Sequence, residues 1–181
     1  AVADGELAPY LAGVNQLLDM QGLRRYQPAD LRGEINQLKA LVDLAHLYGV
    51  AVLLDVVYNH AGGDFGDQSF YFFDRQSTDG GQWNSLYFTD RGHAGGLVFD
   101  FAKPEVRDFL IQNATFFLDE YRVDGFRYDQ VSVIDHDGAP HGWRFCQDLT
   151  SSLHAQRPEA LNHAEYWSVN PYVVKAAPEG A

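Results

Sequence analysis

The chain has 181 residues, of which 46% are hydrophobic, 14% aromatic and 21% charged. This length and composition are typical of an ordered globular protein with one hydrophobic core. The net charge of −12 argues against nucleic acid as a partner, because phosphates select for basic surfaces. No apolar run approaches the roughly 20 residues that span a bilayer, so no membrane association is expected.

Both the cysteine content and the start of the chain restrict what can be inferred about its context. Cys146 is the single cysteine, so an internal disulfide is excluded and redox chemistry does not indicate a compartment. The sequence begins at Ala1 without an initiator Met or a charged-then-apolar leader. We therefore expect a piece of a longer protein.

The first third of the sequence predicts a helix followed by a strand. Residues 7–20 are apolar without a sharp period, whereas the next apolar positions recur at helical spacing and end at a glycine suited to a helix C-cap. These positions are Ile35, Leu38, Val42 and Ala45, with Leu41 widening the stripe and Gly49 as the cap. Residues 50–57 are then almost continuously aliphatic, which predicts a parallel strand buried on both faces.

The middle of the chain combines a long irregular stretch with a clear helix. Residues 58–96 are rich in Gly, Asp, Ser and aromatics and predict a functional loop or a small subdomain. Residues 97–99 predict a short strand, and Pro104 suits the first turn of a helix. The inward stripe expected for that helix is Val106, Phe109, Leu110, Ala114 and Phe117.

The remaining elements alternate, because residues 121–129 predict a strand, 143–154 a helix and 161–166 a last strand. Alternation of this kind indicates parallel βα units. Three or four strands are too few for a (β/α)8 barrel, which takes about 250 residues. The sequence therefore indicates either a small open sheet or part of a barrel.

Ionisable residues within these apolar strands are the main functional signal, since burying an unpaired carboxylate costs several kcal/mol. Asp55 interrupts the aliphatic strand, and Arg127 and Asp129 are two apart, so their side chains share one face. Phe126 and Tyr128 then face the covering helices. Glu165 lies near the end of the last predicted strand, and ligands bind at the carboxyl ends of parallel strands.

Two carboxylates that face one cleft from different strands suit glycoside hydrolysis with retention, at a separation of about 5–5.5 Å. Arg127 would keep Asp129 ionised by charge pairing. Glu165 is followed by Tyr166 and Trp167, and we expect desolvation between aromatics to raise its pKa, as an acid needs near neutral pH.

Three segments in order resemble the signatures of the α-amylase family of glycoside hydrolases. They are residues 55–60 (DVVYNH), 125–129 (GFRYD) and 164–167 (AEYW), and the resemblance covers roughly residues 22–170. It implies part of a (β/α)8 barrel, an α/β fold, containing about strands 3–5. The implied domains are residues 1–57 and 103–181 as barrel parts, with residues 58–102 as an inserted subdomain.

The resemblance also implies roles for individual residues. Asp129 would be the nucleophile, Glu165 the general acid/base, and Arg127 the residue that positions Asp129. Asp55 would be a buried support for the arginine, and His60 would hydrogen-bond the sugar. The expected substrate-binding set is His60, Tyr58, Asp55 and Trp167. Asn59 stands where many members bind calcium, although no cofactor is expected to be required.

Two departures from the family pattern affect this interpretation. The fourth signature, which carries a third essential carboxylate, is absent from these residues, so we expect the chain alone to be inactive. Ser132 and Val133 replace the Lys-His pair of many amylases, which counts against calcium binding and an amylase-like acceptor site.

The run from residue 97 to 134 looks closest to glycogen branching enzymes. We therefore expect α-1,4-glucan branching, with glycogen, starch or maltooligosaccharides as partners and a cytoplasmic location. The alternatives are an amylase-type hydrolase and a non-catalytic glucan-binding relic.

Several histidines and aromatic residues have no specific role in this interpretation. His93, His136, His141 and His163 are expected at the surface or in local hydrogen bonds, and a set of aromatics could form a subdomain core or a sugar platform: Phe65, Phe70, Tyr71, Phe72, Phe73, Trp83 and Tyr87.

Overall fold

The structure is a computed structural model that describes residues 6–61, 74, 85–176 and 178–181. The chain forms two compact units. One contains Ala1–Val52 with Glu120–Val123, and the other contains Leu53–Asp119 with Asp124–Ala181. Among the described residues, no helix is long and apolar enough to cross a membrane.

The first unit is helical. It consists of α1 (Leu7–Met20), the 3-10 helix η2 (Pro28–Leu31) and α2 (Glu34–Leu47). Its core is a cluster of Leu7, Leu31 and Ala40, against which Leu11 and Tyr26 pack.

The helix over residues 34–47 was expected, and its predicted inward stripe is confirmed at Val42 and wrong at Ile35, Leu38 and Leu41. Ile35 and Leu41 are 61% and 55% exposed, and Leu38 is also exposed, whereas Ala40 and Val42 are the buried positions. The reason is that α2 turns Ala40 toward Leu7 and Leu31, and a helix that buries this side leaves Ile35 and Leu41 outside.

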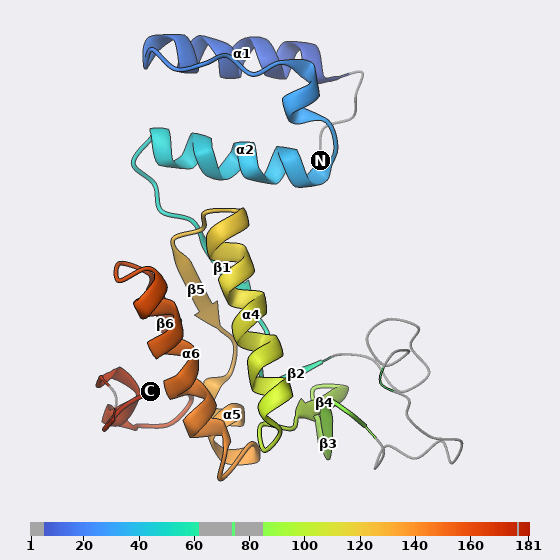
Figure 1. Cartoon of the computed structure of the whole chain (residues 1–181), viewed down its shortest axis with the longest axis vertical. Helices are drawn as coiled ribbons and strands as arrows, with labels where there is room; N and C mark the ends of the chain where they lie inside the picture. Colours follow the sequence, from blue (N-terminus) through green and yellow to red (C-terminus); the bar gives the residue numbers. More distant parts are fainter. Residues whose placement is uncertain (1–5, 62–73, 75–84, 177) are drawn as a thin grey trace. The chain divides into compact units, whose positions relative to one another are not determined.

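The second unit is built on a parallel three-stranded sheet with the order β1-β5-β6 (Figure 1). Its strands are β1 (Leu53–Val56), β5 (Gly125–Tyr128) and β6 (Leu161–Ala164). The register pairs Asp55 with Arg127, and Arg127 with His163. The predicted parallel arrangement of these segments is thereby confirmed.

Burial of the first strand differs from the expectation. Its four residues alternate between exposed and intermediate, although the aliphatic run predicted a strand covered on both faces. In the part of the chain that the structure describes, β1 pairs with β5 alone. An edge position of this kind leaves the side chains of β1 partly open to solvent.

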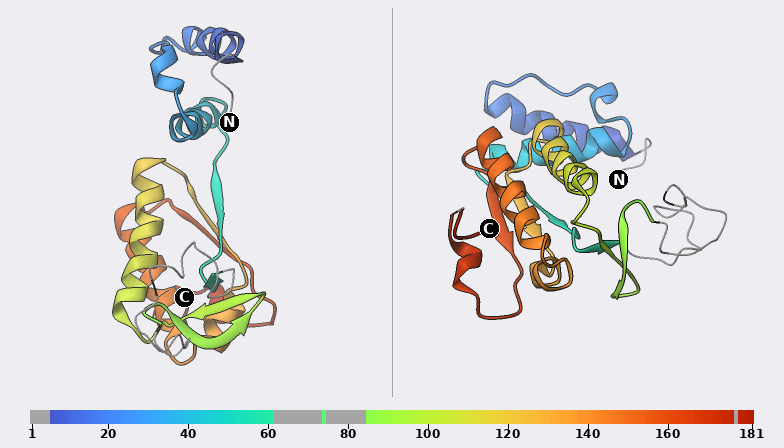
Figure 2. Two further views of the ribbon diagram at one scale, coloured as in Figure 1. Left: turned by 90° about the vertical axis from the view of Figure 1, so that its right-hand side faces the viewer. Right: turned by 60° about the horizontal axis from the view of Figure 1, so that its bottom comes forward.

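Helices α4 (Pro104–Glu120) and α6 (Gly142–Gln156) lie on the same side of this sheet (Figures 1 and 2). Phe126 and Tyr128 of β5 are almost completely buried, which confirms that they face the core. The rings of Phe101 and Phe145 stack there at 4.9 Å.

The buried stripe of α4 agrees with the predicted one at Val106, Leu110 and Ala114 and differs at two positions. Phe109 is 38% exposed, and Leu118 is buried where Phe117 was expected. Leu118 follows Ala114 by four residues, so it continues the same helical face.

An antiparallel sheet with the order β2-β4-β3 follows β1. It contains β2 (His60–Ala61), β3 (Phe88–His93) and β4 (Gly96–Phe99). Only β4 was expected from the sequence, because β3 contains a single buried residue, Phe88, and has no apolar alternation.

Two short helices complete the unit, α5 (Val131–Asp137) and η4 (Pro171–Val174). Among the aromatics of the insertion, Tyr87 packs against Phe109 with ring centroids 5.5 Å apart. The others lie outside the described residues: Phe65, Phe70, Tyr71, Phe72, Phe73 and Trp83.

Candidate active site

The carboxyl ends of β5 and β6 place two acidic residues beside each other. Asp129 follows β5, and its N–H donates to the oxygen of Val56 at 3.0 Å. Glu165 follows β6, and its N–H donates to the oxygen of Tyr128 at 3.0 Å. Both residues therefore continue the hydrogen-bonding ladder of the sheet, which fixes their backbones where the strands end.

Arg127 connects the carboxylates of all three strands. Its Nη1 lies 2.7 Å from Asp55 Oδ1 and 3.0 Å from Asp129 Oδ1, and its Nη2 lies 2.9 Å from Glu165 Oε2. One guanidinium thus contacts three carboxylates. Its planar set of N–H donors is suited to several such contacts at once. The sequence prediction that Arg127 pairs with Asp129 is confirmed by this geometry.

Glu165 is stabilised in its ionised form, so the expected rise of its pKa is wrong in this structure. The backbone N–H of Gln130 donates to Glu165 Oε2 at 3.0 Å. This hydrogen bond, one from the Trp167 side chain and the charge of Arg127 together lower the pKa of Glu165. The expected cause, desolvation between aromatics, is outweighed because the carboxylate is partly exposed and faces three donors.

Asp55 contacts Arg127 as expected, but it is not a buried support. Its side chain is 67% exposed, because β1 is an edge strand in the described part of the chain. The Asp55–Arg127 ion pair is therefore open to water and screened by salt.

Asn59 and His60 approach Asp129 from the segment after β1. The Nδ2 of Asn59 donates to the backbone oxygen of Asp129 at 2.7 Å and to its Oδ2 at 3.2 Å. Asn59 Oδ1 faces His60 Nδ1, which therefore carries the proton. Asn59 is fully buried, so its amide holds the nucleophile candidate and the histidine in fixed positions.

His60 is half-buried, and its pKa is lowered by desolvation and by the neighbouring charge of His93 when that ring is protonated. A neutral His60 that carries its proton on Nδ1 has Nε2 as an acceptor. The arrangement suits a hydrogen bond from a sugar hydroxyl.

Two residues in the site were not assigned a role from the sequence. Gln130, directly after Asp129, adopts a left-handed conformation with φ 41°, and its Oε1 accepts from His93 Nε2 at 2.6 Å. The ring of His93 meets that of His60 edge-on at 5.1 Å. The hydrogen bond between Gln130 and His93 joins residues that are 37 positions apart, so no local sequence pattern predicts it.

The remaining two predicted substrate-binding residues have different surroundings. Trp167 is 69% exposed and adjoins Glu165 through the hydrogen bond described above. Tyr58 is buried, and its hydroxyl donates to Asn113 Oδ1 on α4 at 2.7 Å. The structure therefore brings Trp167 to the carboxylate cluster and directs the Tyr58 hydroxyl to α4.

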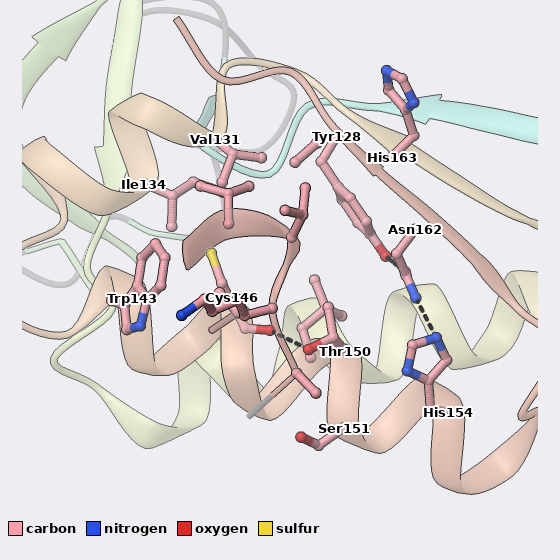
Figure 3. A pocket seen from close by; sticks show the side chains of 17 residues that line it. Tyr128, Val131, Ile134, Trp143, Cys146, Thr150, Ser151, His154, Asn162 and His163 are labelled. Atoms are coloured by element: carbon pink, nitrogen blue, oxygen red, sulfur yellow. Dashed lines mark hydrogen bonds between the residues drawn. The ribbon is translucent and has the colours of Figure 1, made fainter. Parts of the chain in front are cut away.

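A cavity of about 760 Å³ lies on the helix side of the sheet. Figure 3 shows Tyr128 and Asn162 pointing into it from the strands, with Thr150 and His154 on the opposite wall. The Tyr128 hydroxyl donates to Asn162 Oδ1 at 2.8 Å, and Asn162 Nδ2 lies 3.1 Å from His154 Nε2. Among the described residues that line this cavity there is no Asp or Glu side chain, the kind of group that glycoside chemistry requires.

The amide of Asn59, the expected calcium position, is engaged within the protein in this arrangement. Calcium requires six to eight oxygen ligands, whereas both ends of the Asn59 amide are bonded to Asp129 and His60. Within the described residues there is also no group of three or more His, Cys, Asp or Glu side chains that could hold a metal ion.

Comparisons with known proteins relate this chain to enzymes of α-glucan metabolism. It is 30% identical to the 1,4-alpha-glucan branching enzyme GlgB of Corynebacterium diphtheriae over 179 residues, which are 86% of this chain and 23% of that enzyme. It is 35% identical to the 1,4-alpha-glucan-branching enzyme of Saccharomyces cerevisiae over 132 residues, 69% of this chain and 18% of that enzyme.

A third relative is a hydrolase. The chain is 36% identical to the malto-oligosyltrehalose trehalohydrolase of Deinococcus radiodurans over 134 residues, which are 74% of this chain and 20% of that enzyme. It therefore spans about a quarter or less of the length of these curated relatives. No protein-family model matches the chain.

Among solved structures, a cyclomaltodextrinase matches with a TM-score of 0.52 and 26% identity, over 75% of this chain and 24% of the other.

Proposed function

From the premise that this chain is homologous to branching enzymes and other enzymes of the α-amylase family, we propose that it carries the nucleophile and the general acid/base of a retaining α-glucan enzyme. Asp129 is the nucleophile, Glu165 is the acid/base and Arg127 positions both. The observation that carries this proposal is the Arg127 guanidinium, which contacts Asp129 and Glu165 at the ends of neighbouring parallel strands.

The reaction has two steps, and in each of them Asp129 forms or breaks the bond to the sugar while Glu165 gives or takes one proton. In the first, an oxygen of Asp129 attacks the anomeric carbon while Glu165 gives its proton to the leaving glycosidic oxygen. In the second, the Glu165 carboxylate takes the proton of an acceptor hydroxyl, whose oxygen attacks the anomeric carbon and releases Asp129. The configuration at that carbon is retained because it is inverted twice.

The ionised Glu165 of this structure suits the second step directly and the first after substrate binds. A bound sugar displaces water from the partly exposed carboxylate, and desolvation raises the pKa of a carboxyl group. Conversion of Asp129 into a neutral ester then leaves the Arg127 charge to Glu165, which favours the ionised base needed in the second step.

The neighbouring side chains provide substrate contacts in this proposal. His60 offers Nε2 to a sugar hydroxyl, and the exposed indole of Trp167 offers a face on which a pyranose ring packs. Asp55 keeps Arg127 in place. We assign no step to a metal ion.

We propose 1,4-α-glucan branching as the overall activity, with glycogen, starch or maltooligosaccharides as substrates. Support comes from several branching enzymes among the relatives, including two that align with most of this chain. In this role residues 1–57 and 103–181 belong to a (β/α)8 barrel, residues 58–102 form its inserted subdomain, and the protein acts in the cytoplasm.

Hydrolysis is the second candidate, favoured by the 36% identity to a trehalohydrolase. The two activities share the first step and differ in whether a glucan 6-hydroxyl or water accepts the glycosyl group. Their products therefore separate them.

The test incubates the gene product at its full natural length with linear amylose and counts new reducing ends and new α-1,6 branch points. Branch points that appear with almost no new reducing ends establish the branching activity. Reducing ends without branch points establish a hydrolase. If neither forms, and a fluorosugar leaves Asp129 unlabelled, the proposal of a working glycosidase site is overturned.

A further inference from the structure

The described residues form a closed ring of contacts around Asp129, and one member, His93, comes from the hairpin of β3 and β4. Asn59 holds Asp129, and Asn59 in turn is bonded to His60. The His60 ring meets His93, and His93 donates to the side chain of Gln130, which follows Asp129 in the chain. His93 therefore links the segment after β1 to the segment after β5.

Gln130 is the member of this ring that acts on the acid/base. Its backbone N–H donates to Glu165 Oε2, and its conformation, with φ 41° and ψ 56°, is left-handed. A residue with a side chain adopts this conformation at a cost, so surrounding contacts must hold it there. Its backbone oxygen accepts from the N–H of Val133 at 2.9 Å, and its other contacts are the hydrogen bond to Glu165 and the one from His93, which is the only one of these three that reaches its side chain.

The position of His93 depends on the hairpin of β3 and β4. His93 is the last residue of β3 and pairs with Gly96, the first residue of β4. Strand β4 also pairs with β2, where His60 lies opposite Val98. The hairpin is thus hydrogen-bonded to the same segment that carries His60. This pairing fixes the backbone of His93, from which its side chain reaches Gln130.

We propose that His93 is a positioning residue for the acid/base: it holds Gln130 in its left-handed conformation, and through the Gln130 amide it fixes the carboxylate of Glu165. This inference rests on the proposed function. It assigns to the inserted hairpin a part in proton transfer, separate from any contact with the sugar.

The test compares substrates that differ in their need for a proton. An unactivated glucan leaves as an alcohol and requires the acid, whereas fluoride in a maltosyl fluoride leaves with little help from one. The variant His93→Phe keeps an aromatic ring beside His60 and removes the Nε2 donor. The variant His93→Gln keeps an N–H donor at a similar reach, and Asp90→Asn, an exposed position on the same strand, is the matched control.

In the full-length gene product, we expect His93→Phe to lower kcat on an unactivated glucan about 10-fold, part of the 10²–10⁴-fold that acid catalysis supplies, and to change turnover of maltosyl fluoride little. His93→Gln should retain most activity on both substrates, and Asp90→Asn should match the unaltered protein. Circular dichroism and thermal unfolding establish that each variant is folded.

Two results would overturn the inference. An equal loss on both substrates means that His93 acts through general structure, and full activity of His93→Phe on the glucan means that it positions nothing. Failure of the unaltered protein to turn over either substrate is a different result, because it overturns the proposed function itself.

Discussion

The amide of Asn59 donates to Asp129 twice, at 2.7 Å to the backbone oxygen and at 3.2 Å to Oδ2, across 70 positions of sequence. The second carboxylate oxygen of Asp129, Oδ1, lies 3.0 Å from Arg127 Nη1. Each of the two carboxylate oxygens of the proposed nucleophile is therefore bonded to a different residue, Oδ2 to the neutral Asn59 and Oδ1 to the charged Arg127. Such dual restraint fixes the attack geometry before substrate arrives.

Removing the neutral partner should affect both stability and catalysis. We expect Asn59→Ala to lower the free energy of unfolding by about 1–3 kcal/mol, because the groups that Asn59 satisfies lose a buried hydrogen-bond partner. We expect kcat to fall as well, since Asp129 and His60 lose a common support. Urea unfolding and steady-state kinetics measure the two effects.

The control for this variant is Asn36→Ala, which removes an exposed hydrogen bond to the backbone oxygen of Arg32. This substitution should change the free energy of unfolding by no more than about 0.5 kcal/mol. Equal effects of the two substitutions would contradict the bridging role of Asn59.

Removing the nucleophile itself should abolish the covalent step. Asp129→Asn keeps the size of the side chain and cannot form the glycosyl ester, so we expect kcat to fall roughly 10⁴-fold or more, as for other enzymes that lose their nucleophile. Mass spectrometry with a slow fluorosugar substrate should show a mass increase on the unaltered protein, mapped to Asp129, and none on the variant.

Asp135→Asn is a suitable control for charge, because Asp135 lies on α5 and accepts from the Tyr166 hydroxyl at 2.6 Å. This variant should still acquire the label. A label on any residue other than Asp129 would reassign the nucleophile.

The acid/base has a pH dependence whose direction follows from its donors. A hydrogen bond from Trp167 helps to lower the pKa of Glu165, so Trp167→Phe should raise that pKa toward its ordinary value. The protonated acid then persists to higher pH, and the basic limb of the kcat/KM profile should move upward. Carboxyl-selective NMR titration gives the same pKa independently of turnover.

Tyr166→Phe is the matched control, since the Tyr166 hydroxyl faces Asp135. It should leave the pKa of Glu165 unchanged. A basic limb that moves to lower pH in Trp167→Phe would show that the indole does not stabilise the ionised carboxylate.

The parts of the fold and site that sequence predicted are those that local pattern determines. Arg127 and Asp129 share a face because strand side chains alternate, and Phe126 and Tyr128 face the core for the same reason. The parallel pairing of the strands followed from their alternation with helices. The carboxyl ends of those strands then brought Asp129 and Glu165 together, as the motif order indicated.

The parts that sequence missed depend on contacts between distant segments. The exposure of Asp55 follows from the edge position of β1, and the lowered pKa of Glu165 follows from donors on β5, on the turn after it and at Trp167. The link from His93 to Gln130 joins two segments that no local pattern relates. Each of these features is set by tertiary packing, which residue types alone do not specify.

Metal removal gives a prediction that bears directly on Asn59. Because both ends of its amide are bonded within the protein, we expect a chelator such as EDTA to leave the activity and Tm unchanged. Loss of activity that calcium restores and magnesium does not would contradict this.

Gly125, the first residue of β5, gives the last prediction. It pairs with Leu161 of β6, and a Cβ added at Gly125 would meet the backbone of Leu161, including its carbonyl oxygen. Backbone atoms of a paired strand cannot move aside as a flexible side chain can. We therefore expect Gly125→Ala to separate β5 from β6 and to lower the free energy of unfolding by roughly 1–3 kcal/mol or more.

The same substitution should reduce activity, because Arg127 lies on β5, Glu165 directly follows β6, and their 2.9 Å contact depends on the register of these two strands. Gly92→Ala is the matched control: an added Cβ there lies 3.8 Å from the oxygen of Gly96, an ordinary contact. Urea unfolding and turnover of amylose measure both variants. If Gly125→Ala were as stable and as active as Gly92→Ala, close approach of the two strands would not be what places Asp129 beside Glu165.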